Sequence, residues 1–412
     1  MALREGIGRL NKALKELRGP TGLVAVAATI PRVIILLGTI AAGRILPSNE
    51  FDRLIYAVSA SSTLQVLLDP CVYIYLPLVA PTVSSRRWAH LWADGLLLQS
   101  SAGTLLAGLS LAVAVITHAS KSGVLASLAI GVLAGLEGIA RYARVEYQVR
   151  QQFRKYATTD VILAVGRLVS FTFLIVSRSL DAFAVGCVVG CVFPIASITR
   201  AYLRVPLRCR PFISGTIPLL RKVWQYGLST TFSSLQAQSP ALLLGIAGTI
   251  KSAAIYGFVS RFTQPTELIP SAIAAITLPA LVKAGPEARR ALFHHSLWQA
   301  RMIGVLVGFI TVGGGYGALV LSHQYSRQAL LTLLVLSAIL PVKFGNYQNS
   351  NGTIVLGGIK FKLIQNACLA GLAVALVFAL APRGPTVVAL VILGVEILAA
   401  SSYAIFLRRQ TW

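Results

Sequence analysis

The most informative shortage in the sequence is of charged residues, above all acidic ones. Only 12% of the 412 residues are charged, about half the share typical of a soluble domain, whereas 56% are hydrophobic. The apolar segments leave no room for a separate soluble domain. The composition therefore excludes a soluble globular protein and predicts an all-α, polytopic membrane protein.

Cysteine and histidine are also scarce, with five of each. Cys187 and Cys191 fall in one apolar segment and the others are scattered, so no CxxC pair and no Cys/His cluster arises. His294 and His295 are adjacent, which is poor geometry for holding one metal on one helix face. The chain lacks a phosphate-binding P-loop and an HExxH motif. We predict no metal site, no cofactor and no catalytic residue.

The few charges are mostly basic, with 37 Lys and Arg against 13 Asp and Glu and a net charge of +24. In a soluble protein this excess would indicate nucleic-acid binding. In a membrane protein the simpler interpretation is that basic residues collect in the cytoplasmic loops. We therefore expect membrane lipids, and no nucleic acid, as partners.

Twelve segments are long and apolar enough to span a bilayer. If both termini are cytoplasmic, that side holds about 25 of the 37 Lys and Arg and the opposite loops about seven, which favours this orientation. Residues 1–20 alternate leucine or isoleucine with basic residues at helical spacing and predict an amphipathic helix on the membrane surface. The predicted spans are 22–46, 52–79, 92–117, 123–143, 157–177, 181–203, 226–249, 253–281, 297–321, 329–356, 361–381 and 386–407.

Two stretches 200 residues apart indicate an internal duplication. IYAVSASSTLQVLLDP (55–70) and IYGFVSRFTQPTELIP (255–270) share five positions, including Pro70 and Pro270, where we expect a common break in the helix. The matched spans run in the same direction, which predicts two parallel six-helix lobes, an architecture of transporters. The predicted organisation is an N-terminal lobe at 1–203, a basic cytoplasmic linker at 204–222 and a C-terminal lobe at 223–412.

Three of the arginines inside or at the start of predicted spans are candidates for the functional site. A charge in the bilayer centre is costly, so it usually faces other helices or water and is a candidate for function. Arg32 lies midway along its span and Arg261 seven residues into the eighth, and we expect both to line a cavity. Arg53 begins the second span, where anchoring at the membrane surface is an equally good interpretation.

Two acids and one polar helix face complete the candidate site. Glu267 and Glu396 are candidates for carrying a coupling proton or sodium ion. The alternative for Glu267 is an ion pair with an arginine on another helix, and the alternative for Glu396 is pairing with a partner that the sequence does not identify. Lys343, Asn346, Tyr347, Ser350 and Asn351 share one face of the tenth span. We expect this face to line a polar cavity that binds a glycan, with interhelical hydrogen bonding as the alternative.

The sequence also resembles a known family in three places. GTIAAGRILPSNEFDRLIYAVSASSTLQVLLDPCVYIYLP (38–77), AAIYGFVSRFTQPTELIPSAIAAITLPAL (253–281) and QQFRKYATTDVILAVGRLVS (151–170) resemble bacterial polysaccharide transporters of the multidrug/oligosaccharidyl-lipid/polysaccharide (MOP) superfamily. The matches are local, and none of them is a diagnostic motif.

The resemblance implies a V-shaped bundle of two lobes in the bacterial inner membrane. It implies a flippase that carries an undecaprenyl-pyrophosphate-linked oligosaccharide to the outer leaflet by alternating access, for surface polysaccharide biosynthesis. In related flippases, arginines of the first, second and eighth helices line the cavity, and Arg32, Arg53 and Arg261 stand in those helices here. Other polysaccharide-assembly membrane proteins are the partners it implies.

Three other functions stay open. One is a non-transporting membrane scaffold, which the internal duplication and the deep charges disfavour. A cation-coupled multidrug exporter of the same superfamily would need acidic cavity residues for a cationic cargo, whereas the deep charges here include more bases than acids. A polytopic glycan polymerase or glycosyltransferase often carries a bulky outer loop and acidic catalytic residues, and the predicted outer loops are all short.

Overall fold

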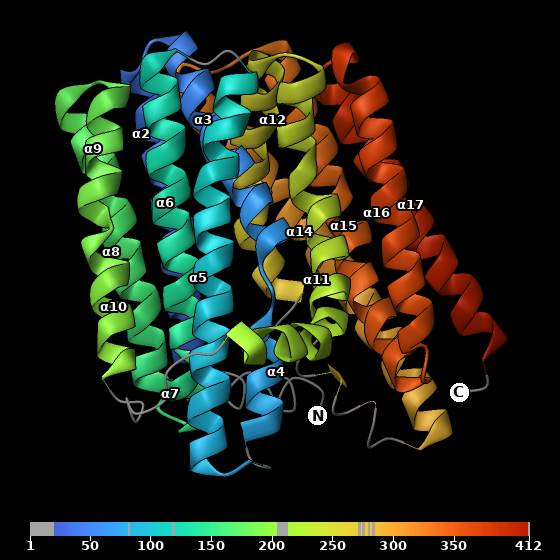
Figure 1. Cartoon of the computed structure of the whole chain (residues 1–412). Coiled ribbons are helices and arrows are strands. Elements are labelled where there is room, and N and C mark those ends of the chain that lie inside the picture. Colours follow the sequence, from blue (N-terminus) through green and yellow to red (C-terminus); the bar gives the residue numbers. More distant parts are fainter. Residues whose placement is uncertain are drawn as a thin grey trace, which may run out of the picture. The chain divides into compact units, whose positions relative to one another are not determined.

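The computed structural model describes residues 20–80, 83–117, 120–203, 213–270, 273, 277–278, 281 and 285–410. Regular structure in these ranges is helical, as predicted (Figure 1). The predicted amphipathic helix at 1–20 lies outside the described residues except for Pro20. In chain order the helices are α2 (Pro20–Ile45), α3 (Ser48–Leu68), α4 (Val72–Val79), α5 (Ser85–Ile116), α6 (Lys121–Ala143), α7 (Val145–Val149), α8 (Phe153–Ser177), α9 (Leu180–Gly190), α10 (Val192–Tyr202), α11 (Ile213–Ala247), α12 (Ile250–Thr263), η2 (Gln264–Glu267), α14 (Pro286–Leu321), α15 (Arg327–Val355), α16 (Ile359–Leu380), η3 (Ala381–Arg383) and α17 (Pro385–Arg409).

Nine helical stretches among the described residues are long and apolar enough to cross a membrane. The prediction of a helical, multi-pass membrane protein is confirmed. Three of the twelve predicted spans, which correspond to α3, α11 and α12, are absent from the nine. Helices α3 and α12 instead contribute many of the polar side chains described below.

The chain divides into two compact units, which are described separately. Unit 1 comprises Met1–Gly38, Leu68–Leu109 and Leu128–Gly227, and unit 2 comprises Thr39–Leu67, Ser110–Ser127 and Leu228–Trp412. Unit 2 takes in two segments of the first 203 residues, so the units are not the predicted lobes, whose boundaries stay a prediction. Helix α11 begins at Ile213, inside the segment predicted as a linker.

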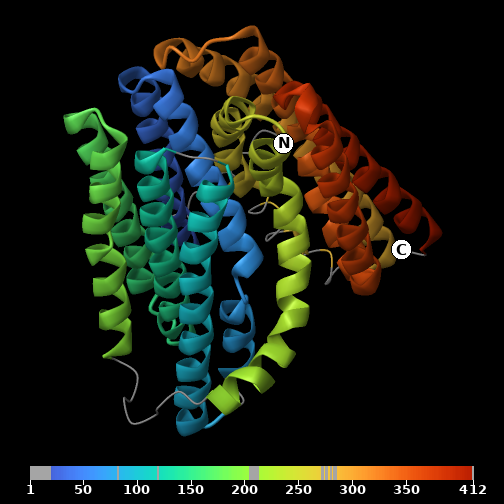
Figure 2. The same ribbon diagram turned by 45° about the horizontal axis from the view of Figure 1, so that its top comes forward.

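Close backbone contact joins the helices of unit 1. A Cβ atom added to Gly190 of α9 would lie 2.6 Å from the carbonyl oxygen of Gly166 in α8, so glycine is needed there. Small residues of this kind are the usual means by which membrane helices approach closely. Figures 1 and 2 show α9 and α10 following one another beside α8. The interruption between them precedes Pro194, whose ring clashes with the carbonyl four residues earlier.

Glycines also let α14 lie along α15 in unit 2. A Cβ atom on Gly304 would lie 2.7 Å from the Cα of Pro341, and one on Gly308 would lie 3.1 Å from the carbonyl oxygen of Ser337. In the same unit, the rings of Phe51 and Phe258 meet edge to face at 5.4 Å and join α3 to α12. These contacts fix the backbones that carry the polar groups of unit 2.

The breaks in the duplicated spans differ from the expected common position. The first span is interrupted between α3 and α4 at Pro70, where Cys71 has a left-handed backbone with φ of 53°. The second changes at Pro265 from α12 into the 3₁₀ turn η2, whereas Pro270 is helical. Proline disfavours a helical conformation in the residue before it, and Pro265 exists only in the second copy. The predicted break at Pro70 is therefore confirmed, whereas the break in the second copy lies at Pro265 and not at Pro270.

Candidate functional site

Nine of the ten predicted site residues belong to unit 2, and Arg32 belongs to unit 1. Arg32 is half-buried in the middle of α2, directly after Pro31. The other nine lie on α3, α12, η2, α15 and α17. They are Arg53, Arg261, Glu267, Lys343, Asn346, Tyr347, Ser350, Asn351 and Glu396.

An ion pair joins η2 to α15 in the interior of unit 2. The Nζ atom of Lys343 donates to Oε1 of Glu267 at 2.5 Å, and the two side chains are 19% and 28% exposed. The alternative of an ion pair for Glu267 is therefore confirmed, but its partner is a lysine and not the expected arginine. Pro265 ends the α-helix and replaces its last turn by η2, the element that carries Glu267.

One turn further along α15, a second acid meets an amide. Asn346 Nδ2 donates to the Glu396 carboxylate at 2.8 Å and to the Glu396 backbone oxygen at 3.0 Å, which joins α15 to α17. Lys343 and Asn346, one turn apart on the same face of α15, thus each contact a carboxylate from another element. Alternating acids and donors of this kind lower the cost of placing charge inside a membrane protein.

The rest of the polar face of α15 also reaches other elements. Thr277 donates to the side-chain oxygen of Gln348 at 2.9 Å, and Asn351 donates to Thr277 at 3.3 Å. Asn346 and Asn351 therefore make the interhelical hydrogen bonds that were the alternative to a cavity role. Ser350 lies beside the Tyr403 hydroxyl, and Tyr347 is half-buried. Contact of this face with a glycan stays a prediction.

Arg261 belongs to the buried face of α12, which otherwise consists mainly of apolar and aromatic side chains. Its residue surface is only 5% exposed, and it is flanked in sequence by Phe262 and Ser260. A guanidinium remains charged under all ordinary conditions, so this position keeps a permanent positive charge inside unit 2. Sequence reasoning identified Arg261 as a deep charge, and the structure places it in the interior of the unit.

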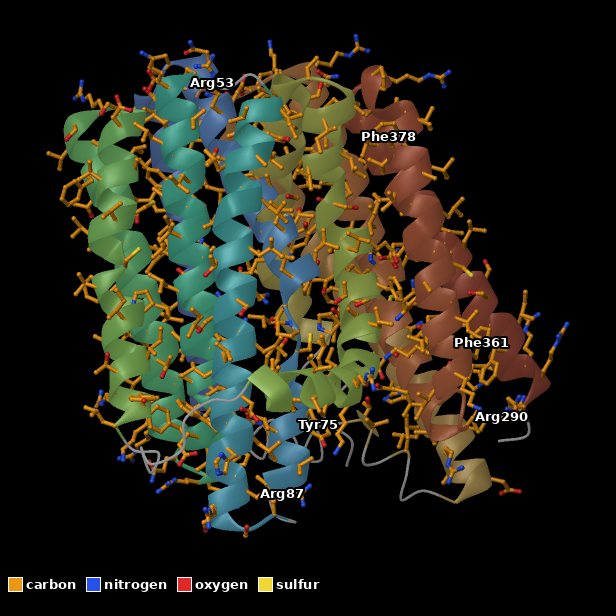
Figure 3. The ribbon with its side chains drawn as sticks, in the orientation of Figure 1. Arg53, Tyr75, Arg87, Arg290, Phe361 and Phe378 are labelled. Atoms are coloured by element: carbon orange, nitrogen blue, oxygen red, sulfur yellow. The ribbon has the colours of Figure 1, made fainter. Side chains whose placement is uncertain are left out.

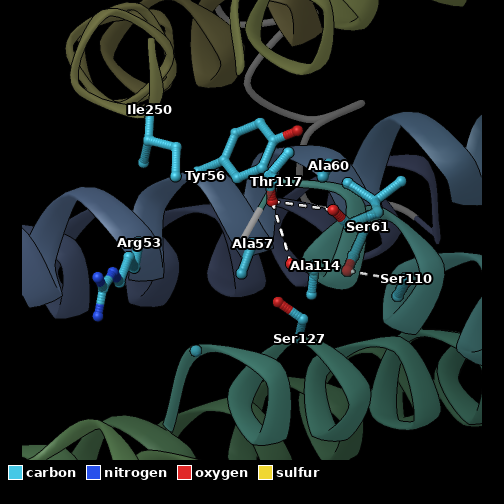
Figure 4. Close-up of a pocket in the computed structure, with 12 residues that line it drawn as sticks. Arg53, Tyr56, Ala57, Ala60, Ser61, Ser110, Ala114, Thr117, Ser127 and Ile250 are labelled. Carbon is cyan, nitrogen blue, oxygen red and sulfur yellow. Dashed lines mark hydrogen bonds between the residues drawn. The ribbon is translucent and has the colours of Figure 1, made fainter. Parts of the chain in front are cut away.

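Arg53 lies at the edge of a small hydroxyl-rich pocket in unit 2 (Figure 4). The Ser61 and Ser110 hydroxyls are 3.2 Å apart in its wall, and Thr117 donates to the backbone of its own helix. The Tyr56 hydroxyl is buried and makes no hydrogen bond with the described residues. The free volume of about 10 Å³ suits about one water molecule, too little for a sugar or a phosphate.

Unit 1 contains a buried ion pair that sequence reasoning missed. Arg167 on α8 donates to both carboxylate oxygens of Glu137 on α6, at 2.7 and 2.6 Å, and the Glu137 side chain is 1% exposed. Arg141 approaches the same carboxylate at 3.5 Å, as the i, i+4 spacing predicts. The signal was Arg167, a deep charge without a local partner, in the predicted span that follows the one containing Glu137. Spacing alone does not identify pairs 30 residues apart.

Unit 1 has two further ion pairs near one end of these helices. Arg144 pairs with Asp160 and lies over the ring of Tyr156, 4.2 Å from its centroid. Glu146 pairs with Arg150 and accepts a hydrogen bond from the Trp88 indole at 2.9 Å. Across the described residues of both units, no group of three His, Cys, Asp or Glu side chains is placed to hold a metal ion.

Comparison with known proteins shows the fold. No family model and no curated protein sequence matches the chain. Two solved structures match with a TM-score of 0.70. They are an inward-facing multidrug resistance MATE family transporter of the MOP superfamily (13% identity, 93% of this chain and 98% of that one) and the lipid II flippase MurJ in an inward closed conformation (12% identity, 94% and 87%).

A third structure is a MOP superfamily transporter from Pyrococcus furiosus whose binding pocket is described as reversed in polarity. It matches with a TM-score of 0.53 and 14% identity, over 95% of this chain and 96% of that one. All three similarities extend over most of both chains, but the sequences have diverged too far to assign a cargo. The chain has the fold of the MOP superfamily transporters, with about 12 transmembrane helices.

Proposed function

We propose that this protein is a flippase for an undecaprenyl-pyrophosphate-linked oligosaccharide. It moves the repeat unit from the inner to the outer leaflet by alternating access, without chemical change, for surface polysaccharide biosynthesis. The fold shared with the lipid II flippase MurJ and with MATE transporters supports a transport function. The polarity of the deep charges supports an anionic cargo.

The observation that carries the proposal is that three carboxylates inside the spans are already engaged. Glu137 is held by Arg167, Glu267 by Lys343 and Glu396 by Asn346. A cationic cargo needs an acid to meet it, and here each of these acids would first have to exchange its present partner. An anionic cargo would instead be met by arginines, which stay charged and bind phosphate oxygens through two parallel hydrogen bonds.

Carrying a lipid-linked glycan across the bilayer requires groups that bind its pyrophosphate and groups that bind its sugars. A pyrophosphate carries about two negative charges and cannot cross about 30 Å of hydrocarbon unaided. Arg32, Arg53 and Arg261 are the residues assigned to the pyrophosphate. The polar face of α15 is assigned to the sugars, while the polyprenyl tail stays in the bilayer. Glu267 and Glu396 are the candidate sites at which transport is coupled to a proton or a sodium ion.

The surroundings follow from the same proposal. The protein works in a bacterial inner membrane with both termini in the cytoplasm, the orientation favoured by the distribution of Lys and Arg. Its partners are the lipid-linked glycan, membrane lipids and other polysaccharide-assembly membrane proteins.

A multidrug exporter is the second candidate, because the MATE transporter matches with the same TM-score as the flippase. Such an exporter would bind a cation, and release of Glu267 from Lys343 would supply the acid. The two candidates therefore differ in the charge that binds the cargo. An anion flippase binds its cargo through Arg261, and a cation exporter binds its cargo through Glu267.

The test is a complementation series in a strain deleted for this gene. Arg261→Gln is expected to lower surface polysaccharide roughly tenfold or more, since a charge-assisted bond to phosphate contributes about 1.5–3 kcal/mol. Arg261→Lys keeps the charge and should restore part of the activity. Lipid-linked glycan should accumulate on the inner leaflet in step with the loss.

The matched control is Lys251→Gln, which removes an exposed cation from the first turn of the same helix. It should leave surface polysaccharide unchanged. All variants are compared at equal membrane levels and with equal thermal stability in detergent. Normal levels of surface polysaccharide in the Arg261→Gln strain would show that Arg261 does not bind the pyrophosphate.

A further inference from the structure

Unit 2 contains a cavity of about 710 Å³ between α14, α15 and α17, separate from the polar groups described above. Arg290, Arg301 and Arg408 contribute its positive charge, and Phe293, Leu297 and Leu407 contribute apolar wall. Figure 3 shows Arg290 near one end of unit 2, with Arg53 and Phe378 near the opposite end. The volume is that of a typical small-molecule site.

The charges of the cavity are not balanced. Three arginines stand against one acid, Glu287, and none of the three has an ion-pair partner among the described residues. The ion-paired arginines of unit 1 behave differently, since Arg144, Arg150 and Arg167 each have a carboxylate partner. Like charges around one hollow repel one another, and a bound anion removes this cost.

Arg301 is the most informative of the three because its position is constrained. It lies fifteen residues after Pro286, roughly 22 Å along α14 at 1.5 Å per residue. A Cβ atom added to Gly345 of α15 would lie 3.0 Å from its Nε atom, so the side chain packs directly on the α15 backbone. Glycine at 345 therefore gives the guanidinium its place in the cavity wall.

The cavity adjoins an apolar surface of α14. Trp298, Met302 and Leu306 follow His294, a cavity-lining residue, at successive intervals of four residues, and they are 61%, 44% and 60% exposed. In a membrane-spanning helix such a stripe faces acyl chains. A charged hollow beside an acyl-facing stripe matches a molecule with an anionic head and alkyl tails.

We propose that this cavity binds an anionic phospholipid, with its phosphate held by Arg290, Arg301 and Arg408. Basic pockets at the ends of transmembrane helices bind anionic head groups in this way. The bilayer itself supplies the ligand. The site lies wholly within unit 2 and uses none of the residues assigned to cargo, so it does not rest on the proposed function.

The experiment measures phosphatidylglycerol binding to the purified full-length protein by native mass spectrometry, with phosphatidylcholine as the neutral comparison. The wild type is expected to retain one phosphatidylglycerol in preference to phosphatidylcholine. The triple variant Arg290→Gln, Arg301→Gln, Arg408→Gln should bind it roughly a hundredfold more weakly, at about tenfold or less for each arginine removed.

The matched control removes three cations that do not line the cavity, by Arg327→Gln, Lys360→Gln and Arg409→Gln. It should bind phosphatidylglycerol as the wild type does. This result would show that binding depends on the cavity and not on the overall net charge. Should the triple variant misfold, Arg408→Gln alone tests the site at the exposed end of α17, and Arg408→Lys should recover binding.

Three results would overturn the proposal. Equal binding of phosphatidylglycerol by the triple variant and the wild type would show that the cavity does not hold the head group. Displacement by millimolar inorganic phosphate would identify a site for free phosphate instead of a lipid. Preferential displacement by undecaprenyl pyrophosphate would identify a site for that carrier lipid instead of a phospholipid.

Discussion

The two units treat their deepest ion pairs differently. In unit 1 the Arg167 guanidinium donates hydrogen bonds to both carboxylate oxygens of Glu137, and the Glu137 side chain is 1% exposed. In unit 2 the Lys343 ammonium meets one oxygen of Glu267, and the acid is 28% exposed. A planar guanidinium holds a carboxylate in one orientation through two hydrogen bonds. The ammonium of a lysine is a point charge on a flexible side chain, so it exchanges partners more easily. We therefore expect the first pair to act mainly in stability and the second to exchange partners during transport.

Breaking the pair in unit 1 should have the largest effect. Arg167→Ala leaves Glu137 buried without its principal partner, and we expect a loss of about 3–5 kcal/mol in stability. Thermal unfolding of the detergent-purified protein measures it. The double variant Arg167→Met, Glu137→Leu removes both charges and should recover most of the loss. If the melting temperature of Arg167→Ala lies within 1–2 °C of the wild type, the ion pair contributes little to stability.

Breaking the pair in unit 2 should cost less stability and more activity. Lys343→Met and Glu267→Gln are each expected to destabilise by about 1–2 kcal/mol, since both side chains are partly exposed. A double-mutant cycle should give a coupling energy of about 0.5–3 kcal/mol. Transport should fall in both single variants even where melting is unchanged. Full transport in Lys343→Met would contradict a role of the Lys343–Glu267 pair in transport.

The smallest effect is expected at the hydrogen bonds beside that pair. Thr277→Val removes the hydroxyl that donates to Gln348 and accepts from Asn351. Interhelical hydrogen bonds in membrane proteins average about 0.6 kcal/mol, so the melting temperature should fall by only a few degrees. Thr277→Ser keeps both bonds and serves as the control. A loss comparable to that of Arg167→Ala would mean that this face of α15 matters more than the ion pairs.

The fold could be predicted from the sequence because lipid imposes length and apolarity on each span. Even the long helix α14 contains its predicted span, 297–321, since the polar residues before it do not interrupt the helix. The break at Pro265 could not be predicted from the repeat, because the repeat aligns Pro70 with Pro270. Its position depends on a residue that the first copy lacks.

The candidate site was predictable only as a set of unusual residues. Arg261, Glu267, Lys343 and Glu396 stand out because charge is rare in these spans, and this holds for any protein of such composition. Their partners were not predictable, since the contacts of Lys343 with Glu267 and of Asn346 with Glu396 span 76 and 50 residues. Such pairs form through tertiary packing, and the periodicity of the sequence does not predict which residues meet.

We propose that the cargo is an anionic lipid-linked glycan. The most direct measurement reconstitutes the purified protein in liposomes and compares two transport rates, the flipping of undecaprenyl-pyrophosphate-linked oligosaccharide and the movement of a cationic dye. The account predicts protein-dependent flipping of the lipid-linked glycan, abolished in Arg261→Gln, and no protein-dependent movement of the dye. Dye transport that requires Glu267, with no flipping of the glycan, would contradict it.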